Sequence, residues 1–330
     1  MIFPMRVVGA SVPSKTTGVH DDYLALLPDE LCPDPLPARR TTWWRWRDMD
    51  VHVERVGEPD APRRALLLHG AGGNAAAMWP IAAQLAGRGV ELVVPDLPGF
   101  GRTRTPRRGA VRLRDWIDLA GDLLRAERRD DARPLTLIGA SMSGMIAYEV
   151  AVRTGLADRV VVTCLVDSRD ARVRRKAARA PWLGAVARPV LRWAAGPFAR
   201  VELPLHLLVN MRAMSNIPAL VDLVLRDRSG GGNRMPLGFV RSFLDAVPSV
   251  EPELVTAPEF VLAHPAADSW TPVELSLPFF ERLAAPRRLV LLPDAGHFPI
   301  EPAGMRMLVD LLAEDPRSAD ATGSRPSDRP

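Results

Sequence analysis

The run Gly139-Ala-Ser-Met-Ser-Gly144 has the residue types that chemistry at a sharp backbone turn requires. It follows a short apolar run, 135–138, which predicts a buried strand, and it precedes a helix-like run, 145–152. A serine on such a turn projects its hydroxyl above the edge of a sheet, and its neighbours must be very small. Ser141 is therefore the candidate nucleophile. Ser143 replaces the second glycine of the pattern G-x-S-x-G, which we interpret as a tolerated variant; an ordinary glycine-rich turn is the alternative.

A serine hydroxyl is a poor nucleophile near neutral pH, so it needs a base within hydrogen-bond reach and an acid that orients the base. Of the six histidines, His297 is the candidate base because it lies in a loop directly after the last apolar run. Asp268 is the candidate acid because it follows the preceding apolar run, and carboxyl ends of neighbouring strands lie side by side. Two rivals remain: Asp167 follows an earlier run, and Asp294 stands three residues before His297.

The oxyanion of a tetrahedral intermediate requires N–H donors. Met142, directly after the candidate nucleophile, can supply one backbone N–H, and Ala71 in the loop His69-Gly70-Ala71 is our choice for the second. We expect His69 to shape this loop by hydrogen bonding rather than to act as a base. A phosphate-binding loop is the alternative interpretation of 70–73, although no Walker lysine follows it. The chemistry requires no cofactor and no metal ion.

The elements that must position these residues alternate between short apolar runs and helical patterns. Continuous apolar runs are typical of a mostly parallel sheet covered on both faces, whose ligands bind beyond the carboxyl ends of the strands. The alternation stops between residues 168 and 255, where we find helical patterns alone. We therefore predict a core of residues 41–167 and 256–314 and a helical insertion of 168–255. An irregular lead-in (1–40) and a disordered tail (315–330) complete the chain.

In their order along the chain, these motifs resemble those of the α/β-hydrolase superfamily. The resemblance covers about residues 45–313 and rests on His69-Gly70 with its following glycines, Asp96-Leu-Pro-Gly-Phe-Gly101, Gly139-x-Ser141, Asp268-x-x-x-Pro272 and Gly296-His297. It implies an α/β-hydrolase fold, with an eight-stranded, mostly parallel sheet flanked by helices and an all-α cap inserted after the sixth strand.

The resemblance also implies a serine hydrolase that acts on esters, thioesters, amides or C–C bonds. Its triad would be Ser141, Asp268 and His297, in the chain order typical of the superfamily. Serine at position 141 argues against the dehalogenase and epoxide-hydrolase branches, which use aspartate there. Apolar residues in the cap favour a small hydrophobic carboxylic ester that reacts through an acyl-enzyme intermediate. A C–C bond hydrolase, an acyltransferase and a non-catalytic binding protein with the same fold are the alternatives.

The composition is that of a globular protein, with 47% hydrophobic and 25% charged residues and a net charge of +4. No apolar run approaches the roughly 18 residues of a membrane span, and we expect a cytoplasmic protein. Residues 168–200 contain nine basic residues and one acidic residue. This segment is either a solvated, arginine-rich face or a surface that meets anionic lipid weakly through Trp182 and Trp193. It lacks a nucleic-acid-binding motif, so we expect no nucleic acid partner.

Overall fold

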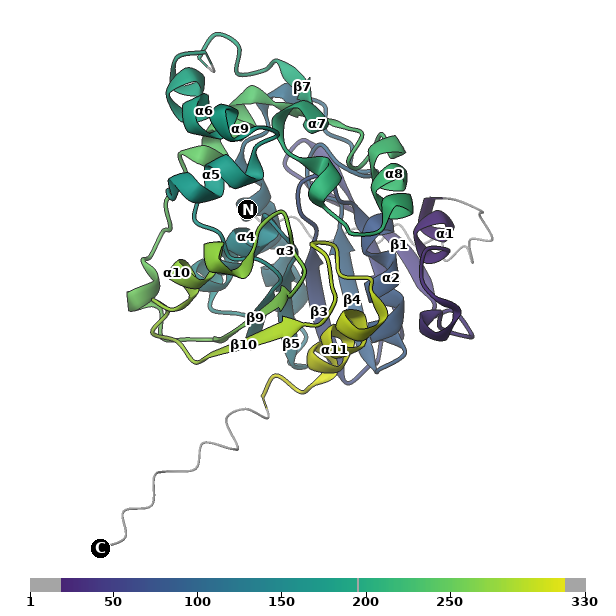
Figure 1. Cartoon of the computed structure of the whole chain (residues 1–330). Helices are drawn as coiled ribbons and strands as arrows, with labels where there is room; N and C mark the ends of the chain where they lie inside the picture. Colours follow the sequence, from purple (N-terminus) through teal and green to yellow (C-terminus); the bar gives the residue numbers. More distant parts are fainter. Residues whose placement is uncertain (1–18, 195, 318–330) are drawn as a thin grey trace, which may run out of the picture.

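Eight strands form one sheet at the centre of the computed structural model, which describes residues 19–194 and 196–317 (Figure 1). Their order across the sheet is β1-β2-β4-β3-β5-β6-β9-β10. β2 pairs antiparallel with β1 and with β4, and the other neighbours are parallel. The strands are β1 (Arg39–Trp46), β2 (Met49–Val56), β3 (Arg63–Leu68), β4 (Val90–Pro95), β5 (Leu135–Gly139), β6 (Arg159–Val162), β9 (Glu259–Pro265) and β10 (Arg287–Leu292). The predicted mostly parallel sheet of eight strands is confirmed.

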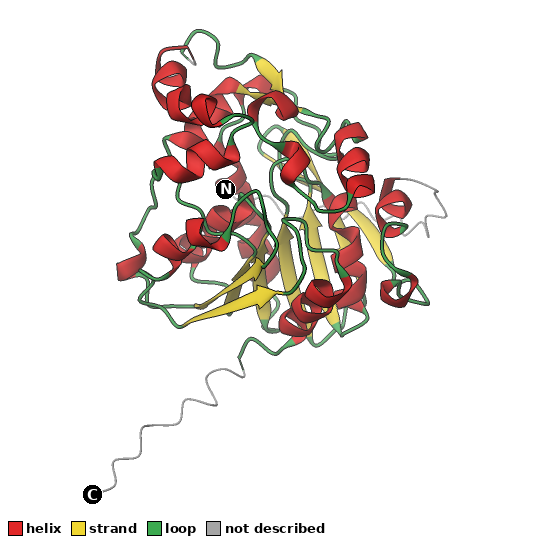
Figure 2. Cartoon of the chain, in the orientation of Figure 1, coloured by secondary structure: helices red, strands yellow, loops and turns green. Residues whose placement is uncertain are grey.

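Helices cover both faces of the sheet (Figure 2). On one face α2 (Ala75–Ala86) packs against α11 (Pro302–Ala313), and on the other α3 (Leu113–Arg128) packs against α4 (Ser143–Thr154). Because both faces are covered, β4 and β5 are buried at every residue, which explains why their sequences are apolar apart from Glu91 and Thr136. Within the described residues, none of the helices has the length and apolarity that crossing a bilayer would require.

The segment between β6 and β9 is an insertion of short helices, called the cap below, which Figure 1 shows at the top of the molecule. It contains α5 (Ala171–Ala177), α6 (Pro181–Ala194), α7 (Leu205–Leu208), α8 (Pro218–Arg226) and α9 (Leu237–Leu244). The prediction of an all-α cap was wrong in one respect, since β7 (Glu202–Pro204) and β8 (Arg234–Pro236) pair antiparallel there. Each of these strands has three residues and ends in proline, so neither is long enough to show the alternation of a strand. After the cap, α10 (Leu277–Phe280) lies between β9 and β10.

The lead-in is also more ordered than its prolines indicated. Residues 1–18 lie outside the described part, but α1 (Val19–Leu24) and a 3-10 turn at Asp29–Leu31 precede β1. Tyr23 and Leu27 are buried, and α1 packs against α2, so tertiary burial holds a segment that has little helical pattern of its own. Of the predicted disordered tail, residues 318–330 lie outside the described part, and Arg317 donates a hydrogen bond to Asp158.

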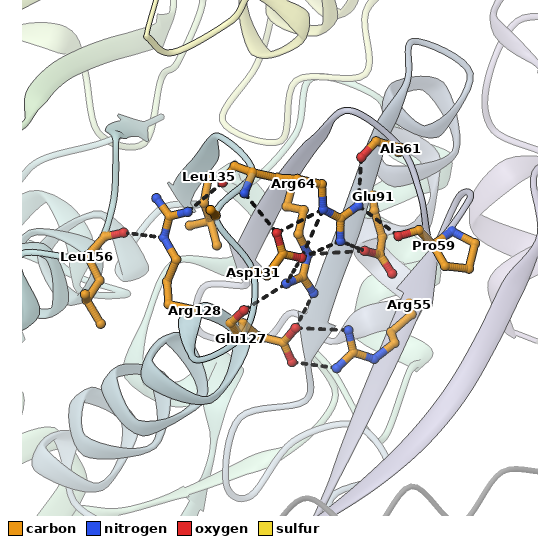
Figure 3. A network of polar contacts seen from close by, with 12 residues as sticks. Arg55, Pro59, Ala61, Arg64, Glu91, Glu127, Arg128, Asp131, Leu135 and Leu156 are labelled. Atoms are coloured by element: carbon orange, nitrogen blue, oxygen red, sulfur yellow. Dashed lines mark hydrogen bonds and ion pairs between the residues drawn. The ribbon is translucent and has the colours of Figure 1, made fainter.

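A network of buried ion pairs joins the amino ends of β3 and β4 to the end of α3 (Figure 3). Arg64 Nε lies 3.1 Å from Glu91 Oε2, and the Arg64 guanidinium also pairs with Glu127 and Asp131. Arg55, which lies in β2, also pairs with Glu127. Burial alone would raise the pKa of Glu127, but the bonds and charges of the two arginines lower it. These charges lie at the edge opposite the carboxyl ends of the strands, so they take no part in the candidate site.

A second buried cluster ties β2 to the loop that follows β4. His52 Nδ1 lies 2.7 Å from Asp96 Oδ2, and His52 Nε2 lies 3.1 Å from Glu54 Oε1. Asp96 also accepts hydrogen bonds from the backbone N–H groups of Ala75 and Arg102, which joins this loop to the start of α2. Burial alone would lower the pKa of His52, but the two carboxylates raise it overall.

We predict that the free energy of unfolding decreases as the pH rises above about 6.5, the ordinary pKa of histidine. A histidine whose pKa is raised in the folded state stabilises the fold fully below its unfolded pKa, and this contribution is lost as the pH rises through the folded pKa. His52→Asn keeps a donor toward Asp96 but does not titrate. Urea unfolding between pH 6 and pH 9 should show a steeper loss of stability for the wild type than for this variant. An equal pH dependence of stability in the two proteins would contradict the assignment of this effect to His52. The other charged or titratable groups close to the cluster are His20, Arg39 and Arg102.

Candidate active site

Ser141 occupies a tight turn between β5 and α4, with a left-handed backbone at φ 54°. Its N–H donates a 3.0 Å hydrogen bond to Thr163 Oγ1, which fixes the turn against the chain after β6. A Cβ atom at Gly144 would lie 1.8 Å from the carbonyl oxygen of Cys164. The close approach that the second glycine of G-x-S-x-G usually allows is therefore provided here one position later, which leaves position 143 free to carry a side chain.

The Ser143 side chain connects this turn to the loop after β3. Its hydroxyl is buried and donates a 2.5 Å hydrogen bond to the carbonyl oxygen of His69. On the same loop, a Cβ atom at Gly70 would lie 2.8 Å from Ser141 Cβ, so only glycine lets the two loops approach this closely. The substitution that departs from the motif is thus a contact between the two loops of the site.

His297 and Asp268 follow β10 and β9, which are adjacent parallel strands. His297 Nε2 lies 2.7 Å from Ser141 Oγ, and His297 Nδ1 lies 2.7 Å from Asp268 Oδ2. The structure thus brings together the three residues selected from the sequence. Neither rival carboxylate takes the place of Asp268. The carboxylate within hydrogen-bond distance of His297 Nδ1 is that of Asp268, and Asp167 pairs instead with Arg169 at 2.7 Å.

The carboxylate of Asp268 is held by more groups than the sequence indicated. It accepts hydrogen bonds from the N–H groups of Trp270 and Thr271, at 2.8 and 2.9 Å, and from the Thr271 hydroxyl at 2.8 Å. Burial would raise the pKa of Asp268, but the hydrogen bond and charge of His297 and the bonds from Thr271 lower it to about 2. Sequence reasoning missed Thr271; the available signal was an aspartate followed by a short turn of polar residues.

The hydrogen bonds of His69 hold together the loops that follow β3 and β4. Its Nε2 accepts a 2.9 Å hydrogen bond from the N–H of Leu97, so the proton must lie on Nδ1, which donates to the carbonyl oxygen of Gly70 at 2.8 Å. The ring is fully buried, and burial lowers the pKa of His69. A neutral ring with both nitrogens occupied is not available as a base.

Of the candidate oxyanion donors, Ala71 lies in the loop after β3, and Met142 directly follows Ser141 in the turn before α4. Within residues 19–194 and 196–317, neither backbone N–H donates a hydrogen bond to a carbonyl or a side chain. Both residues line the same cavity beneath the cap. Both N–H groups are thus left without a protein acceptor among the described residues, and they remain the candidate oxyanion donors.

Two apolar cavities meet at Ala71. The smaller, of about 60 Å³, includes Ser141, His297 and Met214 in its wall. The larger, of about 400 Å³, lies between the core and the cap, and its only lining residues with polar side chains among those described are Ser168 and Arg174.

In the described part of the chain, no group of three or more His, Cys, Asp or Glu side chains is arranged to hold a metal ion.

The hydrogen bond from Ser143 predicts a cost in stability. Ser143→Ala leaves the buried carbonyl of His69 without this donor, and an unsatisfied buried acceptor costs about 1–3 kcal/mol. We expect urea unfolding to show a loss of that size. Ser269→Ala is a matched control, since Ser269 is exposed, and it should change stability by less than about 0.5 kcal/mol. Equal stability of the two variants would contradict the role given to Ser143.

Solved structures with the same architecture include lipases and a hydrolase of a dienoate. The monoacylglycerol lipase of Paleococcus ferrophilus aligns with a TM-score of 0.60 and 19% identity, over 80% of this chain and 98% of that chain. A soluble variant of the monoglyceride lipase of Saccharomyces cerevisiae aligns with a TM-score of 0.69 and 14% identity, over 92% and 97%. The 2-hydroxy-6-oxo-6-phenylhexa-2,4-dienoate hydrolase of Rhodococcus sp. strain RHA1 aligns with a TM-score of 0.61 and 19% identity, over 85% and 99%. At these identities the similarity concerns the fold.

Sequence comparison agrees with this fold. A stretch of 125 residues is 30% identical to the magnesium-chelatase 30 kDa subunit of Rhodobacter capsulatus, and the match covers 38% of this chain and 39% of that protein. Residues 65–310, well over half of the chain, match the alpha/beta hydrolase family. The protein therefore belongs to the alpha/beta hydrolase family, as its motifs predict.

Proposed function

We propose that the protein hydrolyses hydrophobic carboxylic esters with Ser141 as the nucleophile. The observation that carries the proposal is the unbroken relay from Ser141 Oγ through His297 to Asp268, with both hydrogen bonds at 2.7 Å. A hydroxyl, a base and an ionised acid in this order are the components that acyl transfer needs. A binding protein would not require all three.

In the proposed mechanism, Ser141 Oγ attacks the carbonyl carbon while His297 Nε2 accepts the hydroxyl proton. Asp268, whose pKa is about 2, remains ionised and holds the imidazole with its Nδ1–H toward the carboxylate. The N–H groups of Ala71 and Met142 stabilise the oxyanion. The tetrahedral intermediate then collapses as His297 returns its proton to the leaving alcohol. Water, activated by the same histidine, releases the acid from the acyl-enzyme.

The substrate class follows from the cavities. A wall that is almost entirely apolar gains free energy by burying a hydrocarbon chain, roughly 0.8 kcal/mol for each buried CH₂ group. The 400 Å³ cavity under the cap reaches Ala71 and Met142, so an acyl or alkyl chain could lie there while its carbonyl stays at Ser141. The same relay could cleave a C–C bond, the activity class of one solved neighbour, or transfer the acyl group to another acceptor.

The first experiment measures hydrolysis of p-nitrophenyl esters of increasing acyl length by the wild type and by Ser141→Ala. We expect activity that rises beyond short acyl chains, and a loss of at least about 10⁴-fold in kcat for the variant, because all three groups act through the nucleophile. A fluorophosphonate should label the wild type at Ser141 and leave the variant unlabelled. Labelling without ester hydrolysis would replace the ester by another acyl or C–C substrate. Absence of both would overturn the enzyme assignment.

The bonds around Asp268 predict a second effect on activity. Thr271→Val removes the hydroxyl that donates to Asp268 Oδ2, so the carboxylate loses one bond and the imidazole is less firmly oriented. A hydrogen bond to a charged group contributes about 1.5–3 kcal/mol, and we expect at least a tenfold lower kcat with little change in KM. Thr271→Ser keeps the hydroxyl and is the matched control. A kcat for Thr271→Val equal to that of the control would show that the hydroxyl does not position the acid.

A further inference from the structure

The cap helix α6 is apolar on two neighbouring sides. Its inner side, with Leu183, Ala187 and Leu191, lines the large cavity. Its outer side exposes a row of apolar residues at the spacing of a helical stripe: Trp182 (66% exposed), Val186 (41%), Val190 (53%) and Trp193 (82%). We call these four residues the outer stripe. Phe198 and Val201, in the segment that follows, are also exposed and extend the apolar character of this face.

Figure 1 places α6 at the outer end of the cap, far from the sheet. Its main packing partners are α5 and α9, which are themselves parts of the cap. The outer stripe therefore has no partner within the described residues, although two exposed tryptophans on one helix are unusual for a surface that only meets water.

The charged residues of the chain segment that carries the stripe all have the same sign. Residues 171–201 contain eight arginine and lysine residues and no aspartate or glutamate. Arg188 and Arg192 pair with Asp245 of α9, but Arg175, Lys176 and Arg179 form no ion pair among the described residues. These three line a surface hollow of about 540 Å³ at the amino end of α6, together with Arg172, Asn210 and one acidic residue, Glu274.

The basic charge of this face distinguishes between the two partners considered, a second copy of the chain and a lipid surface. A second copy of the chain docked by the same face would bring two acid-free basic segments together, which is electrostatically unfavourable. An anionic bilayer surface complements both features, because tryptophan and aliphatic side chains enter the headgroup boundary while arginine and lysine contact the lipid phosphates.

We propose that the outer stripe and its basic flank dock the protein on anionic phospholipid surfaces, and that apolar substrate enters the cap cavity from the lipid. The second part rests on the proposed function. It follows from Val186 and Val190, which are exposed on the outer stripe and also line the cavity that reaches Ala71 and Met142. The wall between lipid and cavity is therefore the single helix α6.

The docking test is flotation of the full chain, as Ser141→Ala, with phosphatidylcholine vesicles that contain either no anionic lipid or 30% phosphatidylglycerol. We expect binding to the anionic vesicles to be at least tenfold stronger and to weaken as salt is added. Trp182→Ala/Trp193→Ala should lower this binding at least tenfold, and Leu254→Ala, at an exposed leucine outside the stripe, should not. Equal binding to both vesicles, or to both variants, would overturn the proposal.

The basic flank has its own charge-matched control. Arg175→Gln/Lys176→Gln/Arg179→Gln should remove most of the preference for anionic vesicles. Arg88→Gln/Arg114→Gln/Arg306→Gln changes the net charge equally, at exposed positions on the core, and should keep that preference. An equal loss for both triple variants would mean that net charge alone attracts the protein. Sedimentation without lipid that shows a dimer dependent on Trp182 and Trp193 would instead assign the stripe to a second copy and overturn docking.

Substrate entry is tested with the wild type and the double tryptophan variant. Neither tryptophan lines the cavity, so hydrolysis of a dissolved short-chain p-nitrophenyl ester should be unchanged. Hydrolysis of a long-chain ester embedded in anionic vesicles should fall at least tenfold in the variant. Equal rates on the embedded ester would overturn entry from the lipid. Vesicle binding without any hydrolysis would leave docking in place and remove the proposed function, so the two failures are distinguishable.

Discussion

The left-handed backbone at Ser141 is the constraint on which the rest of the site depends. A non-glycine residue in this conformation costs about 1–2 kcal/mol, so it persists only where surrounding contacts fix it. Three contacts do so: Thr163 accepts from its N–H, Gly144 packs against the Cys164 carbonyl, and Ser143 binds the His69 carbonyl. Thr163 and Cys164 follow β6, and His69 follows β3. The turn that raises the serine hydroxyl is therefore also the point where the loops after β3, β5 and β6 are held together.

Much of this arrangement could be predicted from sequence because parallel strands end at a common edge. A residue directly after one strand must then lie near the residue directly after the neighbouring strand. Asp268 and His297 could be selected as a pair for this reason. The elements and contacts that the sequence did not predict have shorter or less regular sequence patterns. β7 and β8 have three residues each. α1 owes its order to burial against α2, and Thr271 acts through a side chain whose partner is visible only once the loop after β9 is folded.

The cap is attached to the core unevenly. Near the end of α8, Asp227 Oδ2 accepts hydrogen bonds from Asn74 at 2.7 Å and from Tyr23 at 3.3 Å, so α1, α2 and the cap meet at one buried carboxylate. The α6 side rests mainly on other cap helices. The α8 side is therefore tied to the core by direct polar contacts, whereas α6 rests on other cap helices and lines the large cavity.

The burial of Asp268 explains why this acid accepts so many hydrogen bonds. A buried carboxylate without partners would be driven toward its neutral form, and a neutral acid could not stabilise a charged imidazole at His297. The bonds from Trp270, Thr271 and His297 reverse this effect and keep the pKa of Asp268 at about 2. An ionised acid at this depth thus requires a dense set of hydrogen-bond donors. These donors belong to the core, whereas most of the apolar lining of the 400 Å³ cavity comes from the cap, so separate segments of the sequence build the two parts.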